Sequence, residues 1–303
     1  MTIILGSILV SASMFSISCE YLSPYVLLGQ ELQVVHSNDY TANIDTTIDT
    51  TSQAPLAVHS QILEPLGTIV KSLRGDKIDF SSKRLINNLW GAPPEEILSC
   101  EVYLTENKTY GWHWDRPDPL TKPGINGCQP LYPNVRTGGC PWEPSIVAEF
   151  PVKLSEVKTL QLDVEYSYSE SPTGIYNLAY DMFLSDTNQA SSDPKPEAEI
   201  MIWLQHTLQQ PADAYIGDVS DGINTYGYYS FTMQNGRLYY AFLLKEQTPL
   251  KGQLTVDVKK LMDYLELDPN WYLHGVEFGN EVINGSGKIE ISKNDVNLNG
   301  HEL

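Results

Sequence analysis

The run Glu199-Ile-Met-Ile-Trp-Leu204 indicates the fold class of this chain, because its side chains sort by a period of two. In a strand, successive side chains point to opposite faces of the sheet. One face is then uniformly aliphatic and predicts contact with a core, through Ile200, Ile202 and Leu204. The other face combines an acid, a thioether and an indole, which are Glu199, Met201 and Trp203. That mixture is typical of a ligand-binding cleft, although an edge strand with a solvated acid would give the same run.

A second strand-like run, residues 176–184, also carries polar residues on one face. Asn177, Ala179 and Asp181 lie opposite the larger apolar side chains of the same run. Asn and Asp are poor strand formers, so their presence in an otherwise apolar strand indicates a role beyond packing. The alternative is an Asp near a turn that accepts backbone hydrogen bonds.

A third run, residues 276–282, aligns Glu277, Gly279 and Glu281 on one face. Gly inside a strand commonly marks the close approach of a ligand or of another backbone. Taken alone, Glu281 could equally be a solvated acid at the end of a strand. Together with the first two runs, the pattern favours several acids that face one cleft.

The remainder of the sequence from Asp76 onward alternates short strand-like runs with Gly, Pro, Asn and Asp. Residues 226–234 and 237–245 are joined by Asn235-Gly236, a strong hairpin signal. The segment 256–268 instead has apolar residues at helical spacing. Many strands with one helix predict an all-β fold, in which two sheets form a sandwich and a single helix packs on it.

Composition and motifs exclude several classes of function. The chain has 303 residues and a formal net charge of −19 at pH 7, which argues against nucleic acid or an anionic membrane surface as a partner. Walker loops, dinucleotide-binding glycine motifs, HExxH and His pairs at ligand spacing are absent from the sequence. We therefore expect no cofactor, no nucleotide and no metal. The 18 Tyr and 6 Trp suit a surface that stacks on sugars, although Tyr is also a good strand former.

The N-terminal segment predicts an exported protein. The apolar stretch Ile3–Ile17 is followed by Ser18 and Cys19, which fits an export signal at residues 1–18. A Ser-Cys junction also fits a lipoprotein signal, in which Cys19 would carry a membrane lipid anchor. Residues 19–75 are rich in Ser, Thr, Asp and Asn and predict a tether, and residues 76–303 form the expected catalytic or binding domain.

Four cysteines occur without a C-x-x-C pair, which argues against a zinc ribbon or a redox motif. In an oxidising compartment, Cys128 and Cys140 would close a short loop as a disulfide. Cys100 has no obvious partner unless Cys19 stays free.

Four blocks in this order resemble glycoside hydrolase family 12, the endoglucanases and xyloglucanases. They are Asn87-Asn-Leu-Trp-Gly-Ala92, Tyr176-Asn-Leu-Ala-Tyr-Asp-Met182, Glu199-Ile-Met-Ile-Trp-Leu204 and Trp271-Tyr-Leu-His-Gly-Val-Glu-Phe-Gly-Asn-Glu-Val282 with Gly285-Ser-Gly287. The resemblance covers about Asp76 to the C-terminus. It implies a concanavalin-like antiparallel jelly roll with an open substrate cleft on its concave face.

By this resemblance, Glu199 is the nucleophile, Glu281 is the general acid/base, and Asp181 hydrogen-bonds and orients the nucleophile. Retaining glycosidases place the two carboxyl groups about 5–5.5 Å apart across the scissile bond. The other expected substrate contacts are Asn88, Trp90, Trp142, Met201 and Glu277. The chain departs from the family at Pro141, where related loops carry His, and at Asn280, where they often carry Thr or Phe.

The sequence thus predicts endo-acting, retaining hydrolysis of β-1,4-glucosidic bonds in a glucan of the cellulose, mixed-linkage or xyloglucan type. An enzyme of the related sandwich type that acts on xylan is one alternative. A non-catalytic glucan-binding or surface protein that keeps the cleft is the other. All three candidate acids are present, which favours the enzyme.

Overall fold

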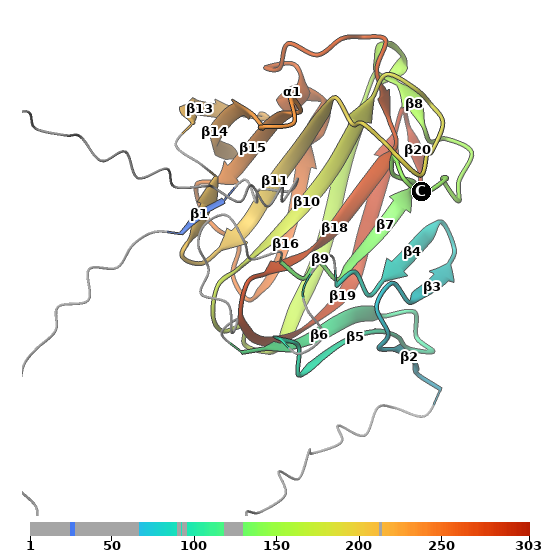
Figure 1. Cartoon of the computed structure of the whole chain (residues 1–303), viewed down its shortest axis with the longest axis vertical. Helices are drawn as coiled ribbons and strands as arrows, with labels where there is room; N and C mark the ends of the chain where they lie inside the picture. Colours follow the sequence, from blue (N-terminus) through green and yellow to red (C-terminus); the bar gives the residue numbers. More distant parts are fainter. Residues whose placement is uncertain (1–24, 28–66, 90–91, 93–95, 118–129, 212–213) are drawn as a thin grey trace, which may run out of the picture.

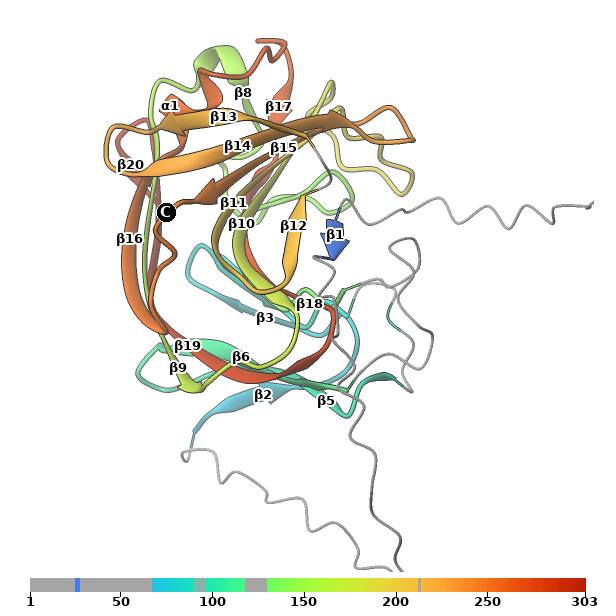
Figure 2. The ribbon, with the colours of Figure 1, turned by 90° about the vertical axis from the view of Figure 1, so that its left-hand side faces the viewer.

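The computed structural model describes residues 25–27, 67–89, 92, 96–117, 130–211 and 214–303, and strands predominate in them (Figure 1). Two large sheets are stacked as curved layers. Figure 2 shows β10, β11 and β18 curving inside the layer formed by β16, β9 and β19. This all-β sandwich confirms the predicted fold class.

The first sheet contains the three runs on which the sequence analysis rests. Its strand order is β13 (Tyr215–Ser220), β14 (Thr225–Thr232), β15 (Leu238–Leu244), β11 (Ala198–His206), β10 (Tyr176–Ser185), β18 (Gly275–Val282), β7 (Asn134–Gly138), β4 (Lys83–Ile86) and β3 (Lys77–Phe80). Two short strands extend it, β17 (Tyr272–Leu273) beside β10 and β8 (Val152–Lys153) beside β17. Among the described strands, β11 and β15 are the neighbours that run parallel.

The second sheet covers the apolar face of the first. Its strand order is β16 (Lys251–Asp257), β9 (Leu160–Glu170), β19 (Gly285–Leu298), β6 (Tyr110–Arg116), β5 (Ser99–Leu104) and β2 (Ile69–Lys71), and β20 (His301–Glu302) pairs with β19. A separate pair consists of β1 (Tyr25–Leu27) and β12 (Gln209–Pro211). The described helices are the 3₁₀ turn η2 (Leu154–Glu156) and α1 (Val258–Met262).

The core between the sheets collects the side chains that alternate inward. Ile200, Ile202 and Leu204 of β11 lie in this core, as the period of two predicted. Trp112 of β6 is fully buried, and its ring centroid lies 6.4 Å from that of Phe278 on β18. Contacts of this kind between large apolar side chains stabilise the stacking of the two sheets.

The helix is shorter than its sequence pattern predicted. Apolar spacing predicted a helix over 256–268, whereas α1 spans Val258–Met262. Val256 is committed to the sheet, because it pairs with β9 as part of β16. Asp257 then caps the helix, since its side chain accepts a hydrogen bond from the backbone N–H of Lys260.

Part of the predicted tether belongs to the sandwich. β2 pairs with β5 and lies upstream of residue 76, so strand pairing of the second sheet begins inside the segment 19–75. The expected signal at 1–18 and the lipid anchor at Cys19 lie outside the described residues, so both stay predictions. No helix in the described part of the chain is long and apolar enough to cross a membrane.

Asn280 on β18 connects the two sheets through its side chain. Its Oδ1 accepts a hydrogen bond from Trp112 Nε1 at 2.9 Å, and its Nδ2 donates to the backbone carbonyl of Asn177 at 2.8 Å and to the Tyr168 hydroxyl at 3.1 Å. Both Asn280 and Trp112 are fully buried. The amide therefore satisfies polar groups that water cannot reach.

Asn280→Ala should lower the free energy of unfolding by about 2–4 kcal/mol. A buried donor or acceptor left without its partner costs about 1–3 kcal/mol, and this change leaves more than one such buried group unpaired. Urea unfolding followed by tryptophan fluorescence measures it. Asn188→Ala is the matched control, since Asn188 lies on an exposed loop and bonds the adjacent Gln189. An Asn280→Ala protein as stable as this control would contradict the prediction.

Candidate active site

A cavity of about 330 Å³ opens on the face of the first sheet that is turned away from the core. Its lining residues are Asn88, Tyr132, Trp142, Asp181, Phe183, Pro194, Glu199, Arg237, Glu277 and Glu281. The lining thus combines four carboxyl groups, one guanidinium and three aromatic rings. The sequence predicted four acids for this site, and all four line the cavity: Asp181, Glu199, Glu277 and Glu281.

Strand register brings the acids together. β10 lies between β11 and β18, and its Asn177 is paired with Glu281 on β18. Four residues further along, Asp181 is paired with Glu277 of the same neighbour. On the other side of β10, Phe183 is paired with Glu199 of β11. Asp181 therefore lies between Glu199 and Glu281 along the strand, and the curvature of the sheet turns these side chains into one cavity.

Glu281 is held by an amide. Asn177 Nδ2 donates to Glu281 Oε2 at 2.5 Å, and the backbone N–H of Glu281 donates to Asn177 Oδ1 at 3.2 Å. Gly279 makes this stretch of β18 possible, because an added Cβ would lie 2.5 Å from the carbonyl oxygen of Pro133. The glycine was predicted to mark a close approach, and the approaching group is this backbone.

Glu199 is held by a cation instead. Arg237 Nη2 lies 2.8 Å from Glu199 Oε2, and both side chains are largely buried. Burial raises the pKa of Glu199, and nearby Glu277 raises it further, whereas Arg237 lowers it. The two candidate reactive acids thus have different partners, which is what two different chemical roles require.

Asp181 lies among the other three acids of the cavity, and their negative charges act on it. Burial raises its pKa well above the usual range, and the charges of Glu199, Glu277 and Glu281 raise it further, against the opposing effect of Arg237. No group among the described residues donates a hydrogen bond to its Oδ1. These surroundings favour a protonated Asp181, which can donate a hydrogen bond to a neighbour inside the cavity.

Tyr132 presents a buried hydroxyl to the same acids. Burial raises its pKa well above the usual range, and the acids that line the cavity add to this shift. Within the described part of the chain, this hydroxyl has no hydrogen-bond partner. It is thus a neutral donor aimed at a site where carboxylates gather.

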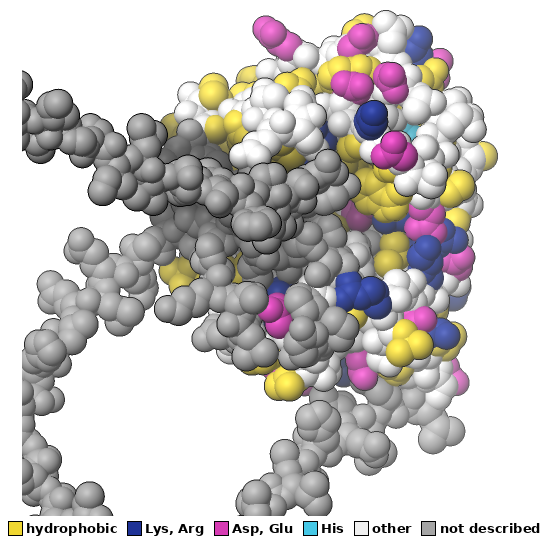
Figure 3. All heavy atoms as spheres, viewed as in Figure 1, with side chains coloured by type: hydrophobic (Ala, Val, Ile, Leu, Met, Phe, Trp, Pro, Cys, Tyr) yellow, Lys and Arg dark blue, Asp and Glu magenta, His cyan; other side chains and the backbone are white. Residues whose placement is uncertain are grey.

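Glu277 belongs to a chain of ion pairs that runs from the cavity to the surface. Arg136 contacts Glu277 Oε1 through Nε at 2.9 Å and through Nη2 at 2.8 Å. The same guanidinium contacts Glu143 at 2.9 Å, and Glu143 pairs in turn with Lys77 and Arg84. Figure 3 shows basic and acidic side chains side by side over β3 and β4, where this chain of pairs reaches solvent.

The aromatic part of the lining can bind a sugar face. Trp142 is 44% exposed, and its ring lies edge-on to Phe183 with 4.9 Å between the centroids. Asn88 lines the cavity as expected, whereas Trp90 lies outside the described residues. Met201 was expected beside the nucleophile as a substrate contact; it is paired with Asp181 across β10 and β11, but it is fully buried and is not part of the lining. Its sulfur instead accepts a hydrogen bond from the Tyr239 hydroxyl at 3.2 Å.

No disulfide is present among the described residues. Cys140 is a free, buried thiol, and Cys128 lies outside the described residues. The Cys140 side chain is buried, and its backbone N–H donates to the carbonyl oxygen of Glu143. Burial raises the pKa of this thiol to about 12, so it is protonated and unreactive at neutral pH.

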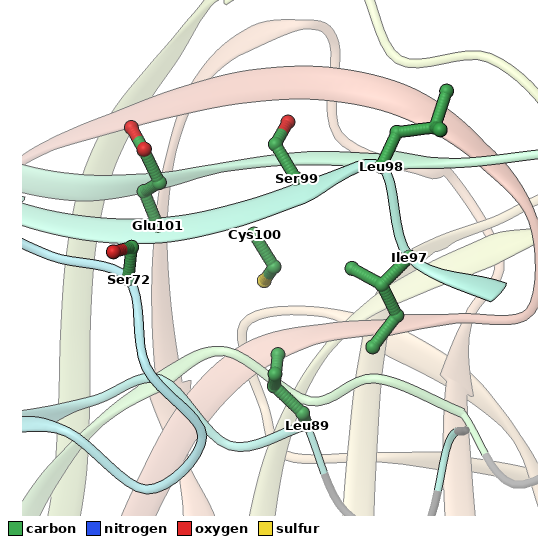
Figure 4. Close-up of a pocket in the computed structure, with 7 residues that line it drawn as sticks. All are labelled: Ser72, Leu89, Ile97, Leu98, Ser99, Cys100 and Glu101. Carbon is green, nitrogen blue, oxygen red and sulfur yellow. The ribbon is translucent and has the colours of Figure 1, made fainter. Parts of the chain in front are cut away.

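A second cavity, of about 260 Å³, lies beside β2 and β5 (Figure 4). Cys100, Leu89 and Ile97 face one another there, and Glu101 points to the other side of the strand. This lining offers a single carboxyl group, the hydroxyls of Ser72 and Ser99, one thiol and three aliphatic side chains. It cannot supply the paired acids of the first cavity.

Sequence reasoning missed Arg237, Tyr132 and Arg136. Arg237 follows the predicted Asn235-Gly236 turn, so its place at the start of a strand could be inferred. Its contact with Glu199 could not, because β15 reaches β11 through a parallel pairing that no local pattern predicts.

Comparison with known proteins agrees with this geometry. The family model described as glycosyl hydrolase family 12 matches residues 82–299. Endoglucanase S of Pectobacterium parmentieri is 28% identical over 229 residues, which cover 72% of this chain and 83% of that protein. A protein of Phytophthora nicotianae named an inactive glycoside hydrolase is 28% identical over 153 residues, covering 48% of this chain and 62% of that protein.

Solved structures show the same relationship. The family 12 xyloglucanase of Bacillus licheniformis, in complex with ligand, superimposes with a TM-score of 0.67 at 30% identity, over 76% of this chain and 99% of that one. Endoglucanase Cel12A of Rhodothermus marinus shares the fold with a TM-score of 0.64 at 21% identity, over 78% of this chain and all of that one. The match across most of the chain, together with a cavity lined by the expected acids, shows that this protein belongs to glycosyl hydrolase family 12.

Proposed function

We propose that this chain is an endo-acting β-1,4-glucanase that retains the anomeric configuration, with Glu199 as nucleophile and Glu281 as general acid/base. The observation that supports it best is the single cavity in which one buried acid contacts a guanidinium and another contacts an amide. A nucleophilic carboxylate must be charged, and Arg237 favours that form of Glu199. An acid catalyst must carry a proton, and a neutral amide such as Asn177 can hold either form of Glu281 in place.

The reaction then proceeds in two displacements. Glu281 donates a proton to the glycosidic oxygen while a Glu199 oxygen forms a bond to the anomeric carbon, and the bond to the leaving sugar breaks. Glu281, now charged, takes a proton from water as the water oxygen attacks the same carbon. The bond to Glu199 breaks with its electron pair returning to the carboxylate, so two inversions give net retention.

Asp181 and the aromatic lining support these steps without exchanging bonds. We expect a protonated Asp181 to orient the nucleophile by donating a hydrogen bond to it, and among the described residues its Oδ1 has no hydrogen-bond partner that would compete. Trp142 and Phe183 offer apolar surface to a glucosyl ring, and Asn88 offers an amide to its hydroxyl groups. The expected polymer is a β-glucan, since one relative is an endoglucanase and another, in Aspergillus niger, is a xyloglucan-specific endo-β-1,4-glucanase. The Aspergillus protein is 29% identical over 151 residues, which cover 48% of this chain and 61% of that protein.

A non-catalytic glucan-binding protein is the second candidate, and the inactive relative in Phytophthora nicotianae is the observation that favours it. The two candidates differ in one measurement. A binding protein retains soluble glucan without producing reducing ends, whereas an enzyme produces them. The complete set of cavity acids favours the enzyme.

Glu199→Gln and Glu281→Gln should each reduce turnover of soluble β-glucan by a factor on the order of 10²–10⁴ or more, because each removes a group that exchanges a bond or a proton. Asp181→Asn should cost less, since Asp181 holds no reacting atom. Reducing-end assays measure turnover, and circular dichroism checks folding. Glu165→Gln, on an exposed position of β9, is the matched control. Normal turnover in either well-folded dyad variant would refute the assignment.

The stereochemistry of the product gives an independent test. Proton NMR of an early hydrolysate should show the β-anomer first, because a covalent intermediate on Glu199 requires two inversions. An α-anomer that appears first would mean a direct attack by water, and Glu199 would then be a general base.

Xyloglucan should be among the good substrates, because an open cavity with exposed Trp142 at its rim can admit a chain whose branches point outward. We expect its kcat/KM to lie within about a hundredfold of the value for mixed-linkage β-glucan, measured side by side with one enzyme preparation. A larger deficit, which corresponds to more than about 2.7 kcal/mol of lost transition-state stabilisation, would mean that the branches clash with the cavity.

A further inference from the structure

Arg237 is fixed in place by its own hairpin before it reaches the cavity. β14 and β15 are joined through Met233–Arg237, in which Gly236 adopts a φ of 88°. The backbone N–H of Arg237 donates to Asn235 Oδ1 at 3.1 Å. Its guanidinium donates to Met233 Sδ from Nε at 3.3 Å and from Nη2 at 3.1 Å. The side chain is thus directed by the turn and does not depend on a substrate for its position.

The guanidinium lies between a ring and the reactive acid. Its central carbon is 5.7 Å from the centroid of Phe183, a distance at which a cation is attracted to an aromatic face. Nη2 is 2.8 Å from Glu199 Oε2, with 13% of the Arg237 side chain and 7% of the Glu199 side chain exposed. A charge pair shielded from water to this degree interacts more strongly than one on the surface.

Among the described residues that line the cavity, Arg237 supplies the positive charge that pairs with Glu199. Four carboxyl groups face the cavity, and Arg136 is already engaged by Glu277 and Glu143. The titratable and charged groups around Glu199 come from every neighbouring element. The acids are Asp181 of β10 and Glu277 and Glu281 of β18. The tyrosines are Tyr132 before β7 and Tyr239 of β15, and the cations are Arg237 and, behind Glu277, Arg136 of β7. Among the groups that shift the pKa of Glu199, Arg237 is the one that lowers it.

We propose that Arg237 is a positioning residue that holds Glu199 in its charged form for attack on the sugar and stabilises it again when it leaves. The inference rests on the proposed function and deepens it. In the second displacement the bond between the anomeric carbon and Glu199 breaks, and its electron pair returns to the carboxylate while the proton of the attacking water goes to Glu281. The charge that reappears on Glu199 lies against the guanidinium, which makes Glu199 a better leaving group.

The two displacements should therefore respond differently to loss of Arg237. Without the guanidinium, the Glu199 carboxylate is more basic, so above its pKa the attack on the sugar is little impaired. Departure of the same carboxylate is slowed, because one pKa unit on a leaving group corresponds to about a factor of ten in its equilibrium stability. The covalent glycosyl-enzyme should then accumulate.

The test compares Arg237→Gln and Arg237→Met, which remove the charge, with Arg237→Lys, which keeps it. The neutral variants should move the acidic limb of the pH profile of kcat/KM to higher pH by at least about one unit, since an opposite charge within contact distance lowers a carboxyl pKa by about 1–3 units. With an activated aryl cello-oligoside, turnover should fall about tenfold or more, and intact-mass spectrometry should find a larger share of enzyme carrying the glycosyl group. Arg237→Lys should stay close to the unmodified protein in both readouts.

Lys245→Gln is the matched control. Lys245 follows the other end of β15, is 44% exposed in its side chain and pairs with Asp218, so its loss should change neither the acidic limb nor the trapped fraction. The inference is wrong if folded Arg237→Gln and Arg237→Met keep the acidic limb of the unmodified protein, or if Arg237→Lys is impaired as much as they are. Using two neutral variants guards against misfolding, since Gln keeps a polar side chain at this position and Met keeps an unbranched apolar one. Absence of glucanase activity in the unmodified protein would refute the proposed function itself, which is a separate outcome.

Discussion

β10 is the strand on which the rest of the structure depends, because all ten of its residues are buried and its two faces have opposite requirements. One face, which includes Leu178 and Tyr180, packs in the core between the sheets. The other presents Asp181 to the cavity and Asn177 to the carboxylate of Glu281. A strand buried on both faces must be flanked by strands on both edges, and β11 and β18 supply the neighbours that bring Glu199 and Glu281 to the same place.

Burial of several carboxyl groups in one cavity is costly, and the surrounding structure is arranged to offset that cost. A charge removed from water needs a partner, a hydrogen bond or a proton. Glu199 and Glu277 have arginines, Glu281 has an amide, and Asp181 has surroundings that favour a proton. In such a low-polarity environment each acid responds strongly to its own partner, and different partners let two identical side chains act as nucleophile and acid.

Stability and geometry of the site are coupled through β18. Asn280 lies between Gly279 and Glu281, and its side chain points away from the cavity to bind Trp112 of the opposite sheet. Gly279 packs against the backbone at Pro133, and this contact fixes how closely β18 approaches that segment. Glu281 is therefore oriented by contacts in the dry interior on one side and by Asn177 on the other, so that little reorganisation is needed when substrate enters.

The sequence by itself determined the fold class, the faces of β10, β11 and β18 and the acids that line the cavity, because a period of two is a local property of the chain. Local patterns also indicated the hairpin that ends at Arg237. Only the tertiary structure decided three other features. They are the parallel pairing that sets Arg237 against Glu199, the pairing of β16 with β9 that shortens α1 to Val258–Met262, and the burial of Cys140. Each of these depends on which strand becomes the neighbour of another across long stretches of sequence. That choice is made by the packing of the whole core, and a single run of residues does not contain it.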